Sequence, residues 1–111
     1  MVRLVVISSA EAATSRPTAI VYDNDLMAVA GLSVAAEMGL SVPRDISLLA
    51  WDDSQLCELT RPKLSAMSHD VYGFGAEVAR RLLAVLGGGQ PAGGPVATPV
   101  LTPRDSTAPP L

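Results

Sequence analysis

The feature that most constrains the fold is a pair of short apolar runs separated by a helix-length segment. Residues 18–22 and 46–51 are almost continuously apolar, as expected of strands that are covered on both faces. Between them, residues 26–38 are rich in Leu, Ala, Val and Met, which favours a helix. A strand, a helix and a second strand at this spacing predict a βαβ unit with a right-handed crossover.

Residues typical of helix ends flank the segment between the two runs. Asp23 and Asn24 precede it, and their side-chain oxygens can accept hydrogen bonds from the free N–H groups of a first helical turn. Gly39 and Leu40 follow it, which fits a left-handed helix stop with a hydrophobic residue just beyond. The sequence therefore predicts a helix that ends close to Gly39.

The remainder of the chain predicts weaker elements. The expected elements are a strand in residues 2–7, a short helix capped within residues 52–54, a strand at residues 64–67, an amphipathic helix from Asp70, an edge strand or extended segment at residues 96–102, and a tail at residues 106–111. Arg80 and Arg81 are expected near the carboxyl end of the amphipathic helix, where the helix dipole favours cations. The fold class is therefore α/β, with a mainly parallel, Rossmann-like sheet.

Composition limits the function classes that the chain can serve. It has 111 residues, 49% of them hydrophobic, and a net charge of −3, so no basic patch is expected for nucleic acid. Cys57 is the single cysteine and cannot form an internal disulfide, which suits a reducing cytoplasm. No run approaches the roughly 20 apolar residues of a membrane span. We expect a soluble cytoplasmic domain without membrane contacts.

Polar side chains gather where three of the predicted strands end. The three groups are Asp23-Asn24-Asp25, Asp52-Asp53 and Ser68-His69-Asp70. The carboxyl ends of parallel strands share one edge, where α/β sheets bind ligands. Acids and an amide suit a neutral ligand with several hydroxyl groups, such as a sugar or nucleoside, and they repel phosphate. No glycine-rich phosphate loop follows the first strand, and neither a cofactor nor a metal is predicted.

Each of these residues also has a structural interpretation. Asp23, Asn24, Asp52 and Asp53 could serve only as helix caps. His69 could be a hydrogen-bonded structural histidine, and Trp51 could pack at the end of the sheet. The sequence alone leaves both interpretations open.

An enzymatic alternative rests on residues 20–25, which are similar to the start of haloacid-dehalogenase-type phosphatases. Such an enzyme would use Asp23 as nucleophile, Asp25 as acid/base and Mg²⁺. Met27 stands where that motif has Thr or Val, and no lysine lies between Asp25 and Asp52. We therefore predict that the chain is not an enzyme and has no catalytic residues.

Several ordered motifs together resemble the carboxy-terminal third of the LacI/GalR (lac-repressor-type) transcription regulators. The matching stretches are residues 17–20 (PTAI), 24–28 (NDLMA), 39–47 (GLSVPRDIS), 51–53 (WDD), Pro62 with residues 64–65, Asp70 with Gly75, and residues 104–110 (RDSTAPP). The resemblance implies half of a periplasmic-binding-protein-like type I fold. Residues 16–111 would be the carboxy-terminal part of the effector-binding and dimerisation domain. Residues 1–15 would be an atypical leader, since the family has an amphipathic helix there.

The resemblance also implies which residues bind. Asn24 and Asp52 match positions that hydrogen-bond sugar or purine effectors, His69 matches a polar contact position, and Val71 stands where some members carry an aromatic wall. Val29 and the segment Leu56-Cys57 match the homodimer interface. DNA would be bound only through a helix-turn-helix head, and this sequence includes neither that head nor the first subdomain of the effector-binding domain. The stripe of apolar residues on the helix after Asp70 would then lack a partner, which predicts self-association.

Overall fold

The computed structural model describes residues 4–7, 17–90, 93–94 and 97–110. In chain order the elements are β1 (Leu4–Ile7), β2 (Ala19–Tyr22), α1 (Asp25–Glu37), β3 (Ser47–Ala50), α2 (Gln55–Leu59), β4 (Ser65–Ser68), α3 (Val71–Leu86) and β5 (Val100–Thr102). They form two compact units, one of Met1–Ser68 with Leu101–Leu111 and one of His69–Val100. The expected helices and the first four expected strands lie close to their predicted positions, whereas the last strand is confined to Val100–Thr102. Residues 2, 3 and 96 lie outside the described part.

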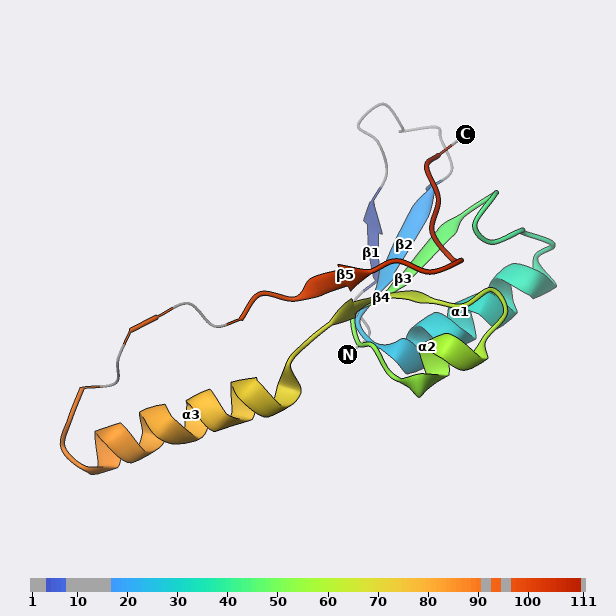
Figure 1. Cartoon of the computed structure of the whole chain (residues 1–111). Helices are drawn as coiled ribbons and strands as arrows, with labels where there is room; N and C mark the ends of the chain where they lie inside the picture. Colours follow the sequence, from blue (N-terminus) through green and yellow to red (C-terminus); the bar gives the residue numbers. More distant parts are fainter. Residues whose placement is uncertain (1–3, 8–16, 91–92, 95–96, 111) are drawn as a thin grey trace. The chain divides into compact units, whose positions relative to one another are not determined.

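The first unit is built on a sheet with the strand order β1-β2-β3-β4-β5 (Figure 1). Strands β2, β3 and β4 are parallel, with Tyr22 opposite Ala50 and Ala50 opposite Ala66. The predicted βαβ unit, β2-α1-β3, is therefore confirmed. Strand β1 runs antiparallel to β2, so the sheet is mixed at that edge.

The core lies between the sheet and two helices on the same side of it (Figure 1). Helix α1 contacts β2, β3 and α2. Alternate strand residues face the helices, because successive strand side chains point to opposite faces. The buried core cluster contains Tyr22, Ala28, Ile46, Leu48, Ala50, Cys57, Leu64 and Ala66. A core of mainly small and aliphatic side chains fits a sequence with only four aromatic-ring residues of the Phe, Trp and Tyr types.

The ends of α1 confirm the capping chemistry. Asn24 is the N-cap, and its Oδ1 accepts from the Met27 N–H at 2.8 Å. At the other end Gly39 has a φ of 71°, and the Leu40 N–H donates to the carbonyl of Ala35 at 2.8 Å. Only a residue without a Cβ adopts this left-handed conformation at little cost.

The carboxy-terminal residues are part of the core, which corrects the prediction of a tail from Ser106 to Leu111. The carboxyl half of β3 pairs with the amino half of β4, and Ser106, with 0% exposure, bonds both Leu48 of β3 and Ser65 at the start of β4. Its Oγ donates to the Leu48 carbonyl at 2.6 Å and accepts from the Ser65 N–H at 2.8 Å. Ser106 therefore satisfies two buried backbone groups where the two strands diverge.

The second unit consists mainly of α3. Asp70 caps the helix through its Oδ1, which accepts from the Gly73 N–H at 2.9 Å. Arg80 and Arg81 are not in the last turn, because the helix continues to Leu86. Both instead bond Glu77, at 2.7 and 2.8 Å. The guanidinium of Arg81, with that of Arg80, lowers the pKa of Glu77. Predicting them as dipole partners was therefore wrong.

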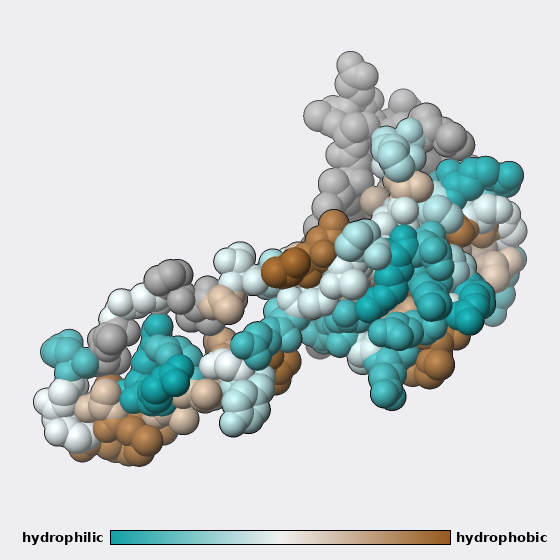
Figure 2. Space-filling view, in the orientation of Figure 1, coloured by the Kyte–Doolittle hydropathy of each residue, from teal (hydrophilic) through white to brown (hydrophobic). Residues whose placement is uncertain are grey.

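No residue of α3 is buried, and apolar side chains lie exposed along it (Figure 2). The exposed apolar residues are Val71, Tyr72, Phe74, Val78, Leu82, Leu83, Val85 and Leu86. All of them except Tyr72 and Leu83 belong to the apolar stripe that the sequence predicts on this helix. The self-association expected of it stays a prediction.

Close packing of Tyr22 on α1 gives a test of the core. A Cβ added at Gly31 would lie 2.2 Å from the Tyr22 hydroxyl oxygen and 2.5 Å from Cζ. Replacing Gly31 with alanine gains about 1 kcal/mol in helix propensity, but displacing the buried ring costs about 1–3 kcal/mol. We expect Gly31→Ala to lower the free energy of unfolding by about 1 kcal/mol in urea titrations followed by circular dichroism.

The control is to measure the effect of Gly31→Ala again in a chain that already carries the Tyr22→Leu substitution. Without the tyrosine ring, Gly31→Ala should become stabilising, because only the gain in helix propensity remains. A Gly31→Ala effect of the same sign and size in both backgrounds would contradict this packing.

Candidate functional site

Two of the three predicted polar groups lie side by side at the carboxyl edge of the sheet. Tyr22 ends β2 and Ala50 ends β3, and the two residues are register partners. The Trp51 N–H donates to the Tyr22 carbonyl at 2.9 Å, so the loops that leave the two strands start from adjacent points. The predicted convergence of residues 23–25 with residues 52–53 is therefore confirmed.

A side-chain hydrogen bond joins these two loops. Ser54 Oγ donates to Asp25 Oδ2 at 2.5 Å, and Ser54 also caps α2 by accepting from the Leu56 N–H at 3.2 Å. Ser54, rather than Asp52 or Asp53, is thus the helix cap. The interpretation of the acidic pair as caps for α2 is wrong, and both acids are left for other contacts.

The second acid of the pair is bound to the carboxy-terminal segment. Arg104 Nη1 and Nη2 donate to Asp53 Oδ1 and Oδ2 at 2.8 and 3.0 Å, and Ser68 Oγ donates to Oδ2 at 2.9 Å. The Arg104 side chain is 13% exposed and the Asp53 side chain is 21% exposed. The hydrogen bond from Arg104, and after it that from Ser68, lowers the pKa of Asp53. Asp53 is therefore ionised at neutral pH, and both of its carboxylate oxygens are engaged in hydrogen bonds within the chain.

Asn24 and Asp52 keep polar groups available to a ligand. Asn24 uses Oδ1 to cap α1, which leaves its side-chain amide nitrogen as a donor. Asp52 is exposed, and its backbone carbonyl accepts from the Cys57 thiol at 3.6 Å. Within the described part of the chain, no hydrogen bond or ion pair is made by the Asp52 carboxylate. The edge thus offers one amide donor and one carboxylate acceptor.

The other two predicted ligand residues belong to the second unit. His69 follows β4 directly and Val71 begins α3, and both are exposed. Asn24 and Asp52 are brought to one edge within the first unit. A shared site with His69 and Val71 stays a prediction.

The predicted dimer residues lie on the two neighbouring helices α1 and α2. Val29 is half-buried, and Leu56 is 40% exposed. Cys57 is fully buried in the chain's own core, so its side chain supports α2 from beneath. Leu56 supplies the exposed apolar surface on which this prediction depends.

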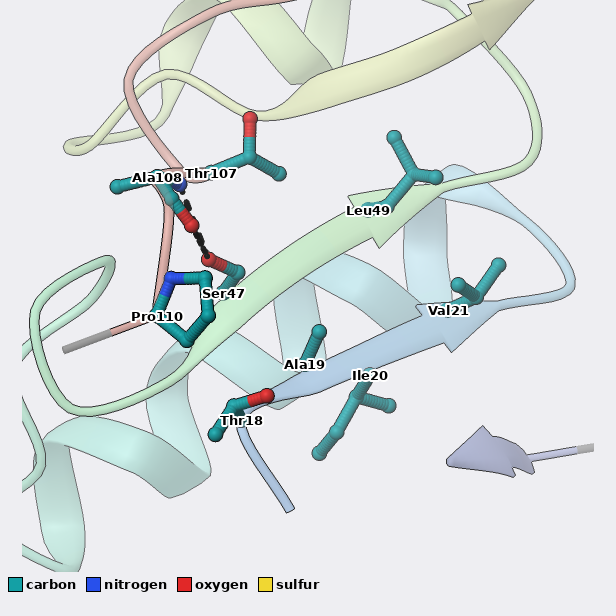
Figure 3. A pocket seen from close by; sticks show the side chains of 9 residues that line it. All are labelled: Thr18, Ala19, Ile20, Val21, Ser47, Leu49, Thr107, Ala108 and Pro110. Carbon is teal, nitrogen blue, oxygen red and sulfur yellow. Dashed lines mark hydrogen bonds between the residues drawn. The ribbon is translucent and has the colours of Figure 1, made fainter. Parts of the chain in front are cut away.

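A hollow of about 240 Å³ lies away from this edge, near the amino ends of β2 and β3 (Figure 3). It is lined by Thr18, Ala19, Ile20, Val21, Ser47, Leu49, Thr107, Ala108 and Pro110. Its walls are mainly apolar, and the Ser47 hydroxyl already bonds the backbone of Ala108 at 3.0 and 3.2 Å. The hollow contains none of the predicted ligand residues and offers few free polar groups to a polyol.

Sequence reasoning gave no role to Arg104, although it is central to this edge. One signal was present: Arg104 is the only cation in residues 82–111. A single arginine in a segment rich in proline and small residues is a candidate for a specific ion pair. Its partner, 51 residues earlier, could not be read from the sequence.

Comparisons with known proteins agree with the fold. The periplasmic-binding-protein-like domain family matches residues 2–107. The HTH-type transcriptional regulator MalR of Streptomyces coelicolor is 38% identical over 92 residues, which cover 82% of this chain and 27% of MalR. The chain therefore spans about a quarter of this relative's length.

Solved structures of LacI-family regulators are also similar. One from Bifidobacterium animalis subsp. lactis has a TM-score of 0.80 at 38% identity and covers 88% of this chain and 36% of its own. One from Arthrobacter, in complex with lactose, has a TM-score of 0.68 at 30% identity and covers 83% of this chain and 34% of its own. A second structure of the Arthrobacter regulator has the same TM-score and identity and covers 84% of this chain and 36% of its own.

The phosphatase alternative finds no support. Asp25 accepts from Ser54 and Asp53 is paired with Arg104. In the described ranges no three His, Cys, Asp or Glu side chains are grouped to hold a metal ion. The relatives named above are transcription regulators.

The helices of the described residues are all too short or too polar to cross a membrane. The sheet, its polar carboxyl edge and the similarities in sequence and structure agree with one another. The chain belongs to the periplasmic-binding-protein-like domain family, in the form found in LacI/GalR-type transcription regulators.

Proposed function

We propose that the carboxyl edge of the sheet binds a small molecule with several hydroxyl groups, a sugar or a nucleoside. The observation that carries the proposal is the placement of Asn24 and Asp52 on adjacent strand-end loops, each with an uncommitted polar group. An amide N–H and a carboxylate oxygen side by side can bind neighbouring hydroxyls, one as acceptor and one as donor. The lactose complex of the Arthrobacter relative supports the sugar class.

In this role the chain is the effector-binding and dimerisation portion of a cytoplasmic transcription regulator, and it has no enzymatic activity. A second copy would pack on α1 and α2 through Val29 and Leu56. DNA would be bound by a helix-turn-helix head joined to this portion. The effector would change the balance between two conformations of the regulator, and the head would respond to that change.

Asn24 has two separable roles, which allows a sharp test. Asn24→Asp keeps the oxygen that caps α1 but replaces the amide donor with an acceptor. We expect this variant to keep its melting temperature within about 2 °C, since the cap is retained. Its affinity for the bound probe should fall about tenfold, because one hydrogen bond to the ligand is lost.

The measurement is a thermal-shift and calorimetric titration with lactose, cellobiose, ribose and adenosine, on the wild-type chain and on Asn24→Asp. Asp52→Asn is the companion variant and should lose affinity similarly, because a charged acceptor becomes a neutral one. Ser33→Ala, on an exposed position of α1, is the matched control and should bind as the wild type does. Unchanged affinity in both Asn24→Asp and Asp52→Asn would show that the ligand binds elsewhere.

A further inference from the structure

The neighbouring acids Asp52 and Asp53 differ in their contacts. Asp53 is bound by Arg104 and Ser68, whereas the Asp52 carboxylate has no partner within the described residues. The loop that carries both acids is only four residues long, from Trp51 to Ser54, between β3 and α2. The contacts of Asp53 therefore decide where Asp52 lies.

The other three residues of this loop, Trp51, Asp52 and Ser54, also make hydrogen bonds. The Trp51 N–H is bonded to Tyr22, and Ser54 is bonded to Asp25. The Asp52 carbonyl accepts from the buried Cys57 thiol at 3.6 Å. These contacts come from β2, α1 and α2. Arg104, through its two bonds to Asp53, ties the loop to the carboxy-terminal segment.

Arg104 is itself held rigidly. Its Nη1 also donates to the Leu64 carbonyl at 2.8 Å, and its backbone N–H donates to Ser65 Oγ at 2.8 Å. Next to it, Thr102 Oγ1 lies 2.5 Å from Ser68 Oγ, the hydroxyl that bonds Asp53. A planar guanidinium that binds a carboxylate through two parallel bonds fixes direction as well as distance.

We propose that Asp53 and Arg104 are positioning residues for the ligand site, and that they hold the Trp51–Ser54 loop so that Asp52 faces a bound polyol. This inference rests on the proposed function. A site works best when the groups behind its binding residues keep them in place, because less ordering is then needed on binding. Arg104 thereby links the carboxy-terminal segment to the ligand-binding edge.

Two conservative substitutions weaken the pair of hydrogen bonds between Arg104 and Asp53, which we call the clamp. Asp53→Asn keeps the shape and removes the charge, and Arg104→Lys keeps the charge but cannot make two parallel bonds. Ser47→Ala is the control, because Ser47 lies at the opposite end of β3 and bonds Ala108. We expect this variant to destabilise the same unit while leaving the contacts of the Trp51–Ser54 loop intact.

The first readout requires no ligand. We expect amide hydrogen exchange at Trp51 and Leu56, whose N–H groups donate to the Tyr22 carbonyl and to Ser54 Oγ, to be about tenfold faster in Asp53→Asn and Arg104→Lys than in Ser47→Ala, when all three are compared under conditions where each chain is folded. Equal exchange in the clamp variants and in Ser47→Ala would overturn the clamp.

The second readout is affinity for the panel of lactose, cellobiose, ribose and adenosine. We expect a loss of about tenfold in Asp53→Asn, a smaller loss in Arg104→Lys, and none in Ser47→Ala. A loosened loop with unchanged affinity would overturn the positioning role. A wild-type chain that binds no probe would contradict the proposed function, and the exchange measurement would still decide whether the clamp orders the loop.

Discussion

Replacing Ser106 with alanine is expected to lower the free energy of unfolding by about 3 kcal/mol. The Ser106 hydroxyl donates to the Leu48 carbonyl and accepts from the Ser65 N–H, and the residue is fully buried. Alanine would leave both backbone groups without this partner at a site that water does not reach. Each unsatisfied buried group costs about 1–3 kcal/mol. Urea titrations of the wild type and Ser106→Ala, followed by circular dichroism, give the difference directly.

Ser33→Ala is the control for the same chemical change on an exposed position of α1. There we expect a change within about 0.5 kcal/mol, because water replaces any lost hydrogen bond. If Ser106→Ala were as mild as Ser33→Ala, the carboxy-terminal residues could not be part of the core in the way described.

Arg104→Met is expected to lower stability by about 2–3 kcal/mol at pH 7, with an effect that shrinks in acid. The methionine removes both bonds to Asp53 and leaves the Leu64 carbonyl without its Nη1 donor. The pKa of Asp53 is lowered mainly by Arg104. The folded state thus gains stability from ionised Asp53 above the pKa of the unfolded chain, about 3.9. This gain is lost as the pH falls through the lowered folded-state pKa.

The free energy of unfolding of both proteins should therefore be measured between pH 7 and acid. The difference in free energy of unfolding between the wild type and Arg104→Met should be nearly constant from pH 7 to about 5. This difference should become smaller below about pH 4, where the wild type loses the ion pair. Lys63→Met is the control, since Lys63 is an exposed cation. A difference that does not depend on pH would mean that Arg104 stabilises the fold only through the Leu64 carbonyl.

The strands and helix ends of this protein could be predicted because their signals are local. The apolar runs at residues 19–22 and 47–50 and the caps Asn24 and Gly39 act on neighbours within a few residues. The convergence of Asn24 and Asp52 followed from parallel strands, since their carboxyl ends must share an edge.

The roles of Ser106, Arg104 and Asp53 could not be predicted, because their partners are distant in the chain. Ser106 bonds residues 58 and 41 positions away, and Arg104 bonds a residue 51 positions away. A serine and an arginine near a chain end look like solvent-exposed residues unless the gap between β3 and β4 is known. Similarly, nothing local shows that Ser54 caps α2 and thereby releases the acidic pair.

Binding of a polyol at the edge formed by Asn24 and Asp52 can be followed through the backbone amide NMR signals of the whole chain during titration with lactose, cellobiose, ribose and adenosine, because this method also detects weak binding. We expect saturable shifts, for at least one probe, that concentrate at residues 23–25 and 51–54. A folded chain whose signals at these residues stay unchanged with every probe, or shift only around Thr18, Ser47 and Ala108, would contradict binding at this edge.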